Sequence, residues 1–265
     1  MSEKKYELVM EDTIKHNTHY DLFRIRALKD IPLHGVKVGD LGGYIESPFN
    51  LSQDGSCWVA NNAKVSELSQ VKDSALIKDD TSIENGSIIK GRAIISDKAH
   101  VVNSVIGGDA RIGGTSTIIN SSIKDKVEVF GETTDNRPLI IETQISNKAK
   151  VLDHTMVTDS VISDNVVIKD DATVSQLSHL SQDACVCGKA IVEACKLSGN
   201  VSIQDSATIV GCTLKYGENV GGVVFVKSND DITFTVNGNR EVTTVVDSQT
   251  DVAEIFETII WKEVI

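Results

Sequence analysis

The stretch GSIIKGRAIISDKAHV, residues 86–101, decides the fold of this chain because it repeats one pattern every six residues. An aliphatic residue stands at positions 89, 95 and 101, and a small residue stands two positions before each of them. A β-strand alternates with a period of two and an amphipathic helix has a period of about 3.6, so a period of six indicates a strand interrupted by a corner. Each six-residue unit is therefore predicted to form one short strand and one bend.

The same phase runs from residue 59 to residue 220 in three columns of aliphatic residues. The first column is Val71, Ile89, Ile106, Ile123, Ile145, Ile162, Leu180, Leu197 and Leu214. The second column is Val59, Ile77, Ile95, Ile112, Val129, Val151, Ile168, Val186, Ile203 and Val220. The third column is Val65, Ile83, Val101, Ile118, Ile140, Val157, Val174, Val192 and Ile209. Three units make a coil of about 18 residues, so the columns predict an all-β solenoid, a single-stranded parallel β-helix with triangular coils. An antiparallel β-sandwich does not predict this fixed phase.

The corners of this solenoid have a sequence signature of their own. Turn formers or acids follow most of the inward aliphatic residues by two positions, as a sharp bend requires. In the first coils these residues are Asp73, Asp79, Asn85, Gly91, Asp97 and Asn103. Some coils have 17 residues instead of 18. In all of them the shorter step, five residues instead of six, lies between the third column and the first, for example between Val101 and Ile106. One corner of the coil is therefore predicted to be tighter than the other two.

The repeat of aliphatic residue, turn and small residue resembles the hexapeptide-repeat proteins, which include bacterial acyltransferases. This resemblance implies a left-handed β-helix. Parallel crossovers are normally right-handed, and the right-handed tube of the bactofilin polymers has a similar coil length, so spacing alone leaves the hand open. The segments FRIRALKDI (23–31), DLGGYIES (40–47) and NLSQDGSCWV (50–59) resemble the leader of hexapeptide-repeat proteins of bacteria and phages, which carries no established activity.

Three regions are expected along the chain. Residues 1–50 alternate in hydrophobicity, with glycines at the turns, and predict a β-rich N-terminal cap, here called the leader. Residues 51–222 are expected to form the β-helix. Residues 223–265 contain the strand-like segments VVFV, DITFTV and REVTTVV, the last two joined in a hairpin at VNGN, and then an amphipathic helix in TDVAEIFETIIWKEVI. Such ends cover the unpaired backbone that a solenoid leaves at each terminus.

Composition excludes several classes of function. The net charge is −12 and no basic stripe offsets it, so nucleic acid is not an expected partner. No apolar run of about 18 residues and no signal-peptide pattern is present, which predicts a cytoplasmic protein without a membrane span. The five cysteines are expected to be reduced, since their number is odd and no secretion signal accompanies them. Cys185 and Cys187 lack the four ligands of a structural zinc site, so no metal is expected.

Candidate catalytic residues follow from the resemblance. Hexapeptide acyltransferases commonly use a histidine as the general base, in a groove between two subunits of a trimer, with acyl-CoA lying along the coils. His100, His154 and His179 are the candidates in the repeat region. Each is equally compatible with an ordinary surface histidine. The strands that carry one column should form one face of the coil, numbered as its column. His100 then lies on the third face and His179 on the first.

Two further features mark possible binding surfaces. The only break in the repeat is GETTDNRPL at 131–139, where Asp135, Asn136 and Arg137 are candidate binding residues. An apolar ribbon is expected to face outward on the second face and the adjoining first face. Its members are Trp58, Leu76, Ile88, Ile94 and Val105. Because such a ribbon is uncommon on a monomer, either the leader or another subunit should cover it. A homotrimer is the assembly that the resemblance favours.

Three functions are compatible with these observations. A non-catalytic scaffold or binding protein, serving a phage or its host, is favoured because no catalytic constellation assembles. An acyltransferase that moves an acyl group from acyl-CoA to a hydroxyl or amine of a small molecule is the alternative, and only this alternative needs a cofactor. A bactofilin-like polymer is third, since structured caps at both ends should block end-to-end stacking.

Overall fold

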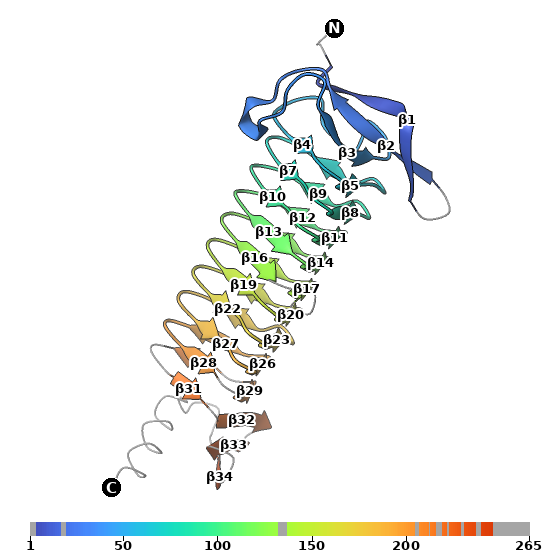
Figure 1. Cartoon of the computed structure of the whole chain (residues 1–265). Coiled ribbons are helices and arrows are strands. Elements are labelled where there is room, and N and C mark those ends of the chain that lie inside the picture. The colour runs from blue at the N-terminus through green and yellow to red at the C-terminus, as the bar shows by residue number, and fades with distance from the viewer. Residues whose placement is uncertain are drawn as a thin grey trace. The chain divides into compact units, whose positions relative to one another are not determined.

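The structure, a computed structural model, shows an all-β parallel solenoid (Figure 1). It describes residues 4–16, 20–131, 137–204, 207–211, 213–215, 219–221, 223–228, 231–236 and 240–245, with side chains up to residue 213. The chain divides into two units, Met1–Glu142 and Thr143–Ile265. The hand of the solenoid stays a prediction.

The first unit begins with the leader, whose three strands form one end of the sheet that becomes the third face of the solenoid. Strands β1 (Tyr6–His16) and β2 (Tyr20–Ala27) pair in antiparallel fashion, and β3 (Leu41–Ile45) pairs antiparallel with β2. A 3-10 turn, η1 (Pro32–His34), lies between β2 and β3. Strand β3 then pairs in parallel with β5 (Lys64–Val65), so the leader sheet continues directly into the third face of the solenoid.

The coils of the first unit contribute one short strand to each of three parallel sheets. The first face contains β6 (Gln70–Val71), β9 (Ile88–Ile89), β12 (Val105–Ile106) and β15 (Ser122–Ile123). The second face contains β4 (Trp58–Val59), β7 (Leu76–Ile77), β10 (Ile94–Ile95), β13 (Arg111–Gly114) and β16 (Glu128–Gly131). The third face contains β5, β8 (Ser82–Glu84), β11 (His100–Val102), β14 (Thr117–Ile119) and β17 (Leu139–Ile141).

The second unit repeats this arrangement. Its first face contains β18 (Gln144–Ile145), β21 (Val161–Ile162), β24 (His179–Leu180), β27 (Lys196–Ser198) and β30 (Thr213–Lys215). Its second face contains β19 (Lys150–Leu152), β22 (Val167–Ile168), β25 (Cys185–Val186), β28 (Ser202–Gln204) and β31 (Asn219–Gly221). Its third face contains β20 (Met156–Thr158), β23 (Thr173–Ser175), β26 (Ile191–Glu193), β29 (Thr208–Val210) and β32 (Val223–Ser228).

Strands β33 (Asp231–Val236) and β34 (Arg240–Val245) extend the third face of the second unit in antiparallel fashion. The three strands expected after the repeat are thus confirmed. The helix expected over 250–265 lies outside the described residues.

The inward columns form the core. Every column residue with a described side chain is at most 1% exposed, and the side chains of Leu214 and Val220 lie outside the described residues. Parallel pairing stacks each column residue on its counterpart one coil away, as Ile95 stacks between Ile77 and Ile112. The three-column prediction is confirmed.

The corner residues adopt the left-handed backbone conformation that a sharp bend needs. Asp73, Asp79 and Asp97 have φ angles of 58°, 63° and 62°. Aspartate and asparagine tolerate this region because their short polar side chains form local hydrogen bonds. The Asp73 carboxylate accepts a hydrogen bond from the Gly91 amide at 2.9 Å, and Asp97 accepts one from Gly114 at 2.8 Å. A corner residue therefore both turns the chain and joins its coil to the next.

The corner between the third and first faces is the tight one, as predicted. Where five residues separate the inward positions, a single residue is left-handed, such as Asn103. Where six residues separate them, two consecutive residues are left-handed. These pairs are Glu67–Leu68, Asn85–Gly86 and Gln176–Leu177. A coil of 18 residues therefore differs from a coil of 17 by one additional left-handed residue at this corner.

The leader packs closely on the first coil. A Cβ atom at Gly42 would lie 2.5 Å from the Val59 carbonyl oxygen and 2.7 Å from Trp58 Cζ2, so only glycine allows this approach. Lys5 is 3% exposed, and its Nζ donates to the carbonyl oxygen of Cys57 at 2.9 Å. Backbone groups at the start of the tube are thereby satisfied by the leader.

No helix in the described part of the chain is long and apolar enough to span a membrane.

Candidate functional site

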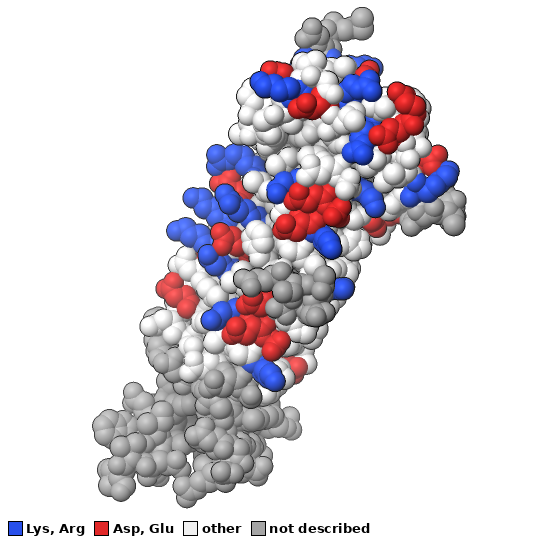
Figure 2. Space-filling model, viewed as in Figure 1, with Lys and Arg blue, Asp and Glu red and all other residues white. Residues whose placement is uncertain are grey.

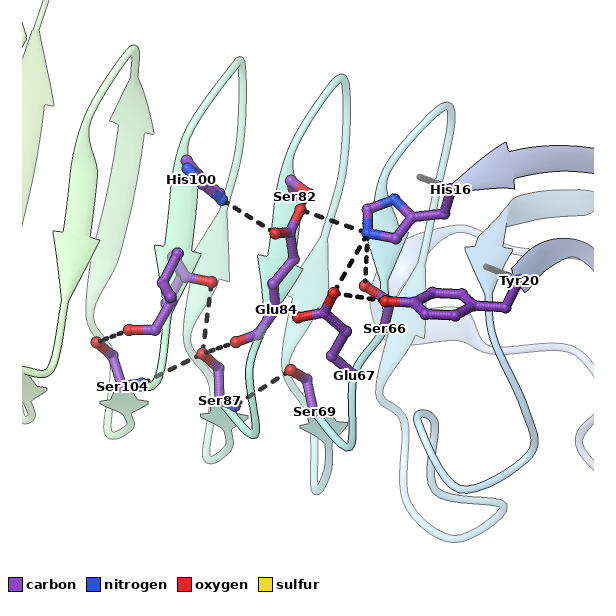
Figure 3. Close-up of polar contacts among 12 residues, drawn as sticks. His16, Tyr20, Ser66, Glu67, Ser69, Ser82, Glu84, Ser87, His100 and Ser104 are labelled. Carbon is purple, nitrogen blue, oxygen red and sulfur yellow. Dashed lines mark hydrogen bonds and ion pairs between the residues drawn. The ribbon is translucent and has the colours of Figure 1, made fainter. Parts of the chain in front are cut away.

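A cluster of titratable side chains joins the tip of the leader to the third face of the first unit (Figure 3). His16 ends β1 and Tyr20 begins β2, so both come from the β1–β2 hairpin. The other members are Ser66, Glu67, Ser82, Glu84 and His100, which lie on or beside β5, β8 and β11. His100 is the one sequence-predicted candidate that belongs to this cluster.

Glu84 occupies the centre of the cluster. Its Oε2 lies 3.5 Å from His100 Nε2, and its Oε1 lies 3.9 Å from His16 Nε2. The Ser82 hydroxyl also donates to Glu84. His16 Nε2 is equally 3.9 Å from Glu67 Oε1, and Glu67 accepts the Tyr20 hydroxyl hydrogen bond. One carboxylate is thus shared by two imidazoles, one from the leader and one from the solenoid.

The electrostatics of this cluster favour its ionised form. The His100 side chain, with the Ser82 hydroxyl, lowers the pKa of Glu84 from 4.5 to about 2, against the opposing effect of burial. Glu84 in turn raises the pKa of His100 above its ordinary 6.5. Burial and the hydrogen bond to Glu67 raise the pKa of Tyr20 above its usual range, so this phenol stays protonated. The pair is therefore a carboxylate and an imidazolium over a widened pH range.

This arrangement is better suited to holding the leader than to proton abstraction. A general base works best when its pKa lies near the working pH. A carboxyl group with a pKa of about 2 is a weak base, and a raised pKa moves His100 toward the form that has no lone pair to accept a proton. The side chains of His16 and Glu84 are only 12% and 20% exposed, whereas that of His100 is 43% exposed, so the contact between the leader and Glu84 is the shielded part of the cluster.

The other two candidate histidines lie in the second unit. His154 sits at an exposed corner, where its Nδ1 is 3.1 Å from Asp171 Oδ1. His179 is exposed on β24 of the first face. Within the described residues, no hydrogen bond or ion pair joins any two of His100, His154 and His179.

The loop that breaks the repeat contributes little to a described site. Arg137 is exposed and has an interaction partner. Asp135 and Asn136 lie outside the described residues, so their role as binding residues stays a prediction.

A groove lies between the leader and the second face of the first unit. Its volume is roughly 640 Å³. Leu33 and His34 of η1 form one wall, and Ile94 and Arg111 of β10 and β13 belong to the solenoid wall. Lys126 extends this wall one coil further, at the corner before β16. Figure 2 shows Lys and Arg side chains gathered along one edge of the molecule, at the left of the view, just below the leader.

The expected apolar ribbon is divided in the structure. Trp58 is 1% exposed because the leader covers it, so it is not available to another subunit. Leu76, Ile88 and Ile94 are half-buried, and Val105 is 38% exposed. Of the two coverings that the sequence allowed, the leader is the one that covers Trp58.

The cysteines with described side chains are all free. Cys57 and Cys195 are buried, two positions before the inward residues Val59 and Leu197, whereas Cys185 and Cys187 are half-buried on either side of the inward Val186. Cys212 lies outside the described residues. In the part of the chain that the structure describes, no group of three or more His, Cys, Asp or Glu residues has the arrangement to hold a metal ion.

No protein-family model matches this chain, and a search of curated proteins gives no match. The fold places the chain among the parallel β-solenoid proteins, a class that hosts many functions.

Sequence reasoning missed most of the residues that form these two sites. The repeat register alone places Glu84 diagonally opposite His100 on the third face. Glu84 directly follows Ile83, and His100 directly precedes Val101, which is the third-column residue of the next coil. The same register aligns Arg92, Asp109 and Lys126, each three positions before a second-column residue. The leader has no repeat, so no sequence pattern indicated that His16 and His34 belong to these sites.

Proposed function

We propose that this chain is a non-catalytic binding or scaffold protein of the hexapeptide-repeat type. The solenoid serves as a rigid support, and the leader completes a binding groove on its second face. One observation carries the proposal: the groove is lined by Arg111, Lys126 and His34, and by none of the three candidate histidines.

The state of His100 supports the same proposal. Its partner Glu84 also lies 3.9 Å from His16 of the leader hairpin, so the ion pair that His100 makes has a structural task in holding the charge of that carboxylate in place. A catalytic base in an acyltransferase has to present a free nitrogen to the acceptor. Here Nε2 is directed at the Glu84 carboxylate (Figure 3), and this pairing raises the pKa of His100, so the imidazolium form, which cannot accept a proton, is favoured.

An acyltransferase that uses acyl-CoA is the second candidate. The observation that favours it is the histidine–carboxylate pair itself, because a carboxylate orients the imidazole in many general bases. A bactofilin-like polymer is less well supported, because the leader covers the N-terminal edge where a second copy would stack.

The assembly proposed for this protein is a homotrimer, by resemblance to the acyltransferases, or a complex with a phage or host protein. Val105 and Ile88 are neighbours on the first face, and Val105 is the more exposed of the two. Replacing both with glutamate should reduce the mass measured by light scattering to that of one chain if this face carries the contact. A cytoplasmic location and the lack of a nucleic-acid partner remain predictions from composition.

A thermal-shift measurement with CoA and acetyl-CoA tests the proposed function. A ligand that binds only the folded state raises the melting temperature by mass action. We expect no shift at millimolar concentrations of either compound. A shift of several degrees that disappears in His100→Ala, and persists in His179→Ala, would support the acyltransferase instead.

A further inference from the structure

We propose that the groove beside η1 binds a small organic anion that has an apolar body and a carboxylate or phosphate group. This inference rests on the proposed binding function and adds the chemical class of the ligand. It concerns residues of the first unit only.

The size of the groove suits a small molecule. Its volume of roughly 640 Å³ falls within the range of about 300–1,000 Å³ that is usual for ligand sites. Its walls come from two separate regions of the chain, since η1 belongs to the leader and β10 and β13 belong to the solenoid. A ligand held there would contact both.

The groove carries excess positive charge in a protein whose net charge is −12. Arg92 is already neutralised by Asp109, since its Nε lies 2.6 Å from Oδ1 and its Nη2 lies 2.8 Å from Oδ2. The structure gives neither Arg111 nor Lys126 an ion pair within the described residues, although both act on Asp109 at longer range. Glu128 also lines the groove and has a partner. The lining thus holds three cations, Arg92, Arg111 and Lys126, against two carboxylates, Asp109 and Glu128, which leaves a surplus of one positive charge for an anionic ligand.

His34 adds a polar group that is short of partners. Its Nε2 is buried and has no hydrogen-bond partner of good geometry among the described residues, although the Ser74 and Ser56 backbones lie close enough to favour protonation. Burial is the main cause that lowers the pKa of His34 below 6.5, so the ring is neutral at pH 7. Because this nitrogen is buried, His34 contributes its ring to the groove wall, and Arg111 and Lys126 are the groups left to meet an anionic ligand.

Apolar side chains complete the site. Leu33 is 59% exposed at the mouth of the groove, and Ile94 is half-buried on the solenoid wall. A bare inorganic ion would leave these surfaces wet, whereas a ligand with an apolar body would cover them. A long polyanion is disfavoured because the net negative charge outside the groove would repel it.

The test uses four probes of similar shape: benzoate, phenyl phosphate, benzyl alcohol and benzylamine. Each is titrated into the full-length protein by calorimetry at low and high salt. We expect saturable binding of benzoate or phenyl phosphate, weakened by salt, and clearly weaker binding of the alcohol and the amine. Leu33→Asp, on the opposite wall, should also weaken the binding of the anions.

The repeat provides a matched control. Arg111 and Lys126 stand one and three positions before second-column residues, and Lys150 and Lys148 hold the same two positions before Val151. The double variant Arg111→Gln with Lys126→Gln should weaken anion binding by about tenfold or more. Lys148→Gln with Lys150→Gln removes the same charge elsewhere and should leave binding unchanged.

The outcomes separate the two proposals. Equal weakening by both double variants, or no saturable binding of any probe, would overturn the anion site. Binding of the alcohol or amine as tight as that of the anions would overturn the ligand class while the binding function stands. Acyl transfer by the same sample would overturn the proposed function itself.

Discussion

At the corner between the third and first faces, one left-handed residue accompanies a step of five residues between inward positions, and two accompany a step of six. Leu68 and Leu177 each occupy the second of two left-handed positions, with φ angles of 62°, and are 75% and 76% exposed. A leucine in this conformation costs about 1–2 kcal/mol, because its Cβ crowds the carbonyl oxygen that follows. Both leucines bury little surface that would offset this cost.

Leu177→Asn is therefore expected to stabilise the protein. Asparagine tolerates the left-handed region, so the free energy of unfolding should rise by roughly 1 kcal/mol in urea titrations. Leu180→Asn, three residues along and 1% exposed, should lower it by several times that amount. A loss of stability in both Leu177→Asn and Leu68→Asn would contradict this interpretation of the corner.

The Glu84–His100 pair predicts a pH dependence of stability. The pKa of Glu84 is lowered from 4.5 to about 2 in the fold, so its contribution is present above pH 4.5 and is lost as the pH falls toward 2. The pKa of His100 is raised above 6.5, so its contribution is present below pH 6.5 and is lost as the pH rises through the raised value. The pair contributes most between these two limits.

Urea titrations of the wild type and Glu84→Gln over a range of pH measure this contribution. The difference in the free energy of unfolding should be largest between about pH 4.5 and 6.5 and should shrink on both sides. Because His100 is 43% exposed, solvent screening keeps the alkaline limb small. A difference that stays constant with pH would show that the two groups do not interact.

At the scale of the element, the leader has an apolar core that includes the fully buried Leu22, Ile25 and Ile45, and it also approaches the backbone of the first coil closely at Gly42. Gly42→Ala should displace β3, since the added methyl group has no room beside the Val59 carbonyl and the Trp58 ring. Gly107→Ala is the matched control, because its nearest neighbours are flexible Lys90 atoms at 3.4 and 3.5 Å.

Fluorescence quenching by acrylamide reports the result for Trp58. In the wild type this tryptophan is 1% exposed, and Gly42→Ala should make it accessible to the quencher, whereas Gly107→Ala should not. Trp261, the second tryptophan, contributes a signal of its own, so both glycine variants are compared in a Trp261→Phe background. Unchanged quenching in the Gly42 variant would mean that the leader does not depend on this contact.

The solenoid elements were predictable from sequence, but the leader contacts were not. Six-residue spacing specifies which side chain of each strand points inward, because a parallel stack repeats its register in every coil, as Ile77, Ile95 and Ile112 do. The leader has no repeat, so nothing in its sequence aligns His16 with Glu84 or His34 with the second face. Long-range contacts of a non-repeating segment depend on three-dimensional packing that spacing does not encode.

For the whole molecule, the central claim is that this protein binds a ligand and does not transform one. Chromatographic measurement of acetyl-CoA consumption, with a panel of small amines and alcohols as acceptors, tests this claim most directly. The account predicts that consumption by the wild type equals that of His100→Ala and of a protein-free control. Consumption that requires the wild-type chain, is abolished in His100→Ala and is retained in His179→Ala would contradict it.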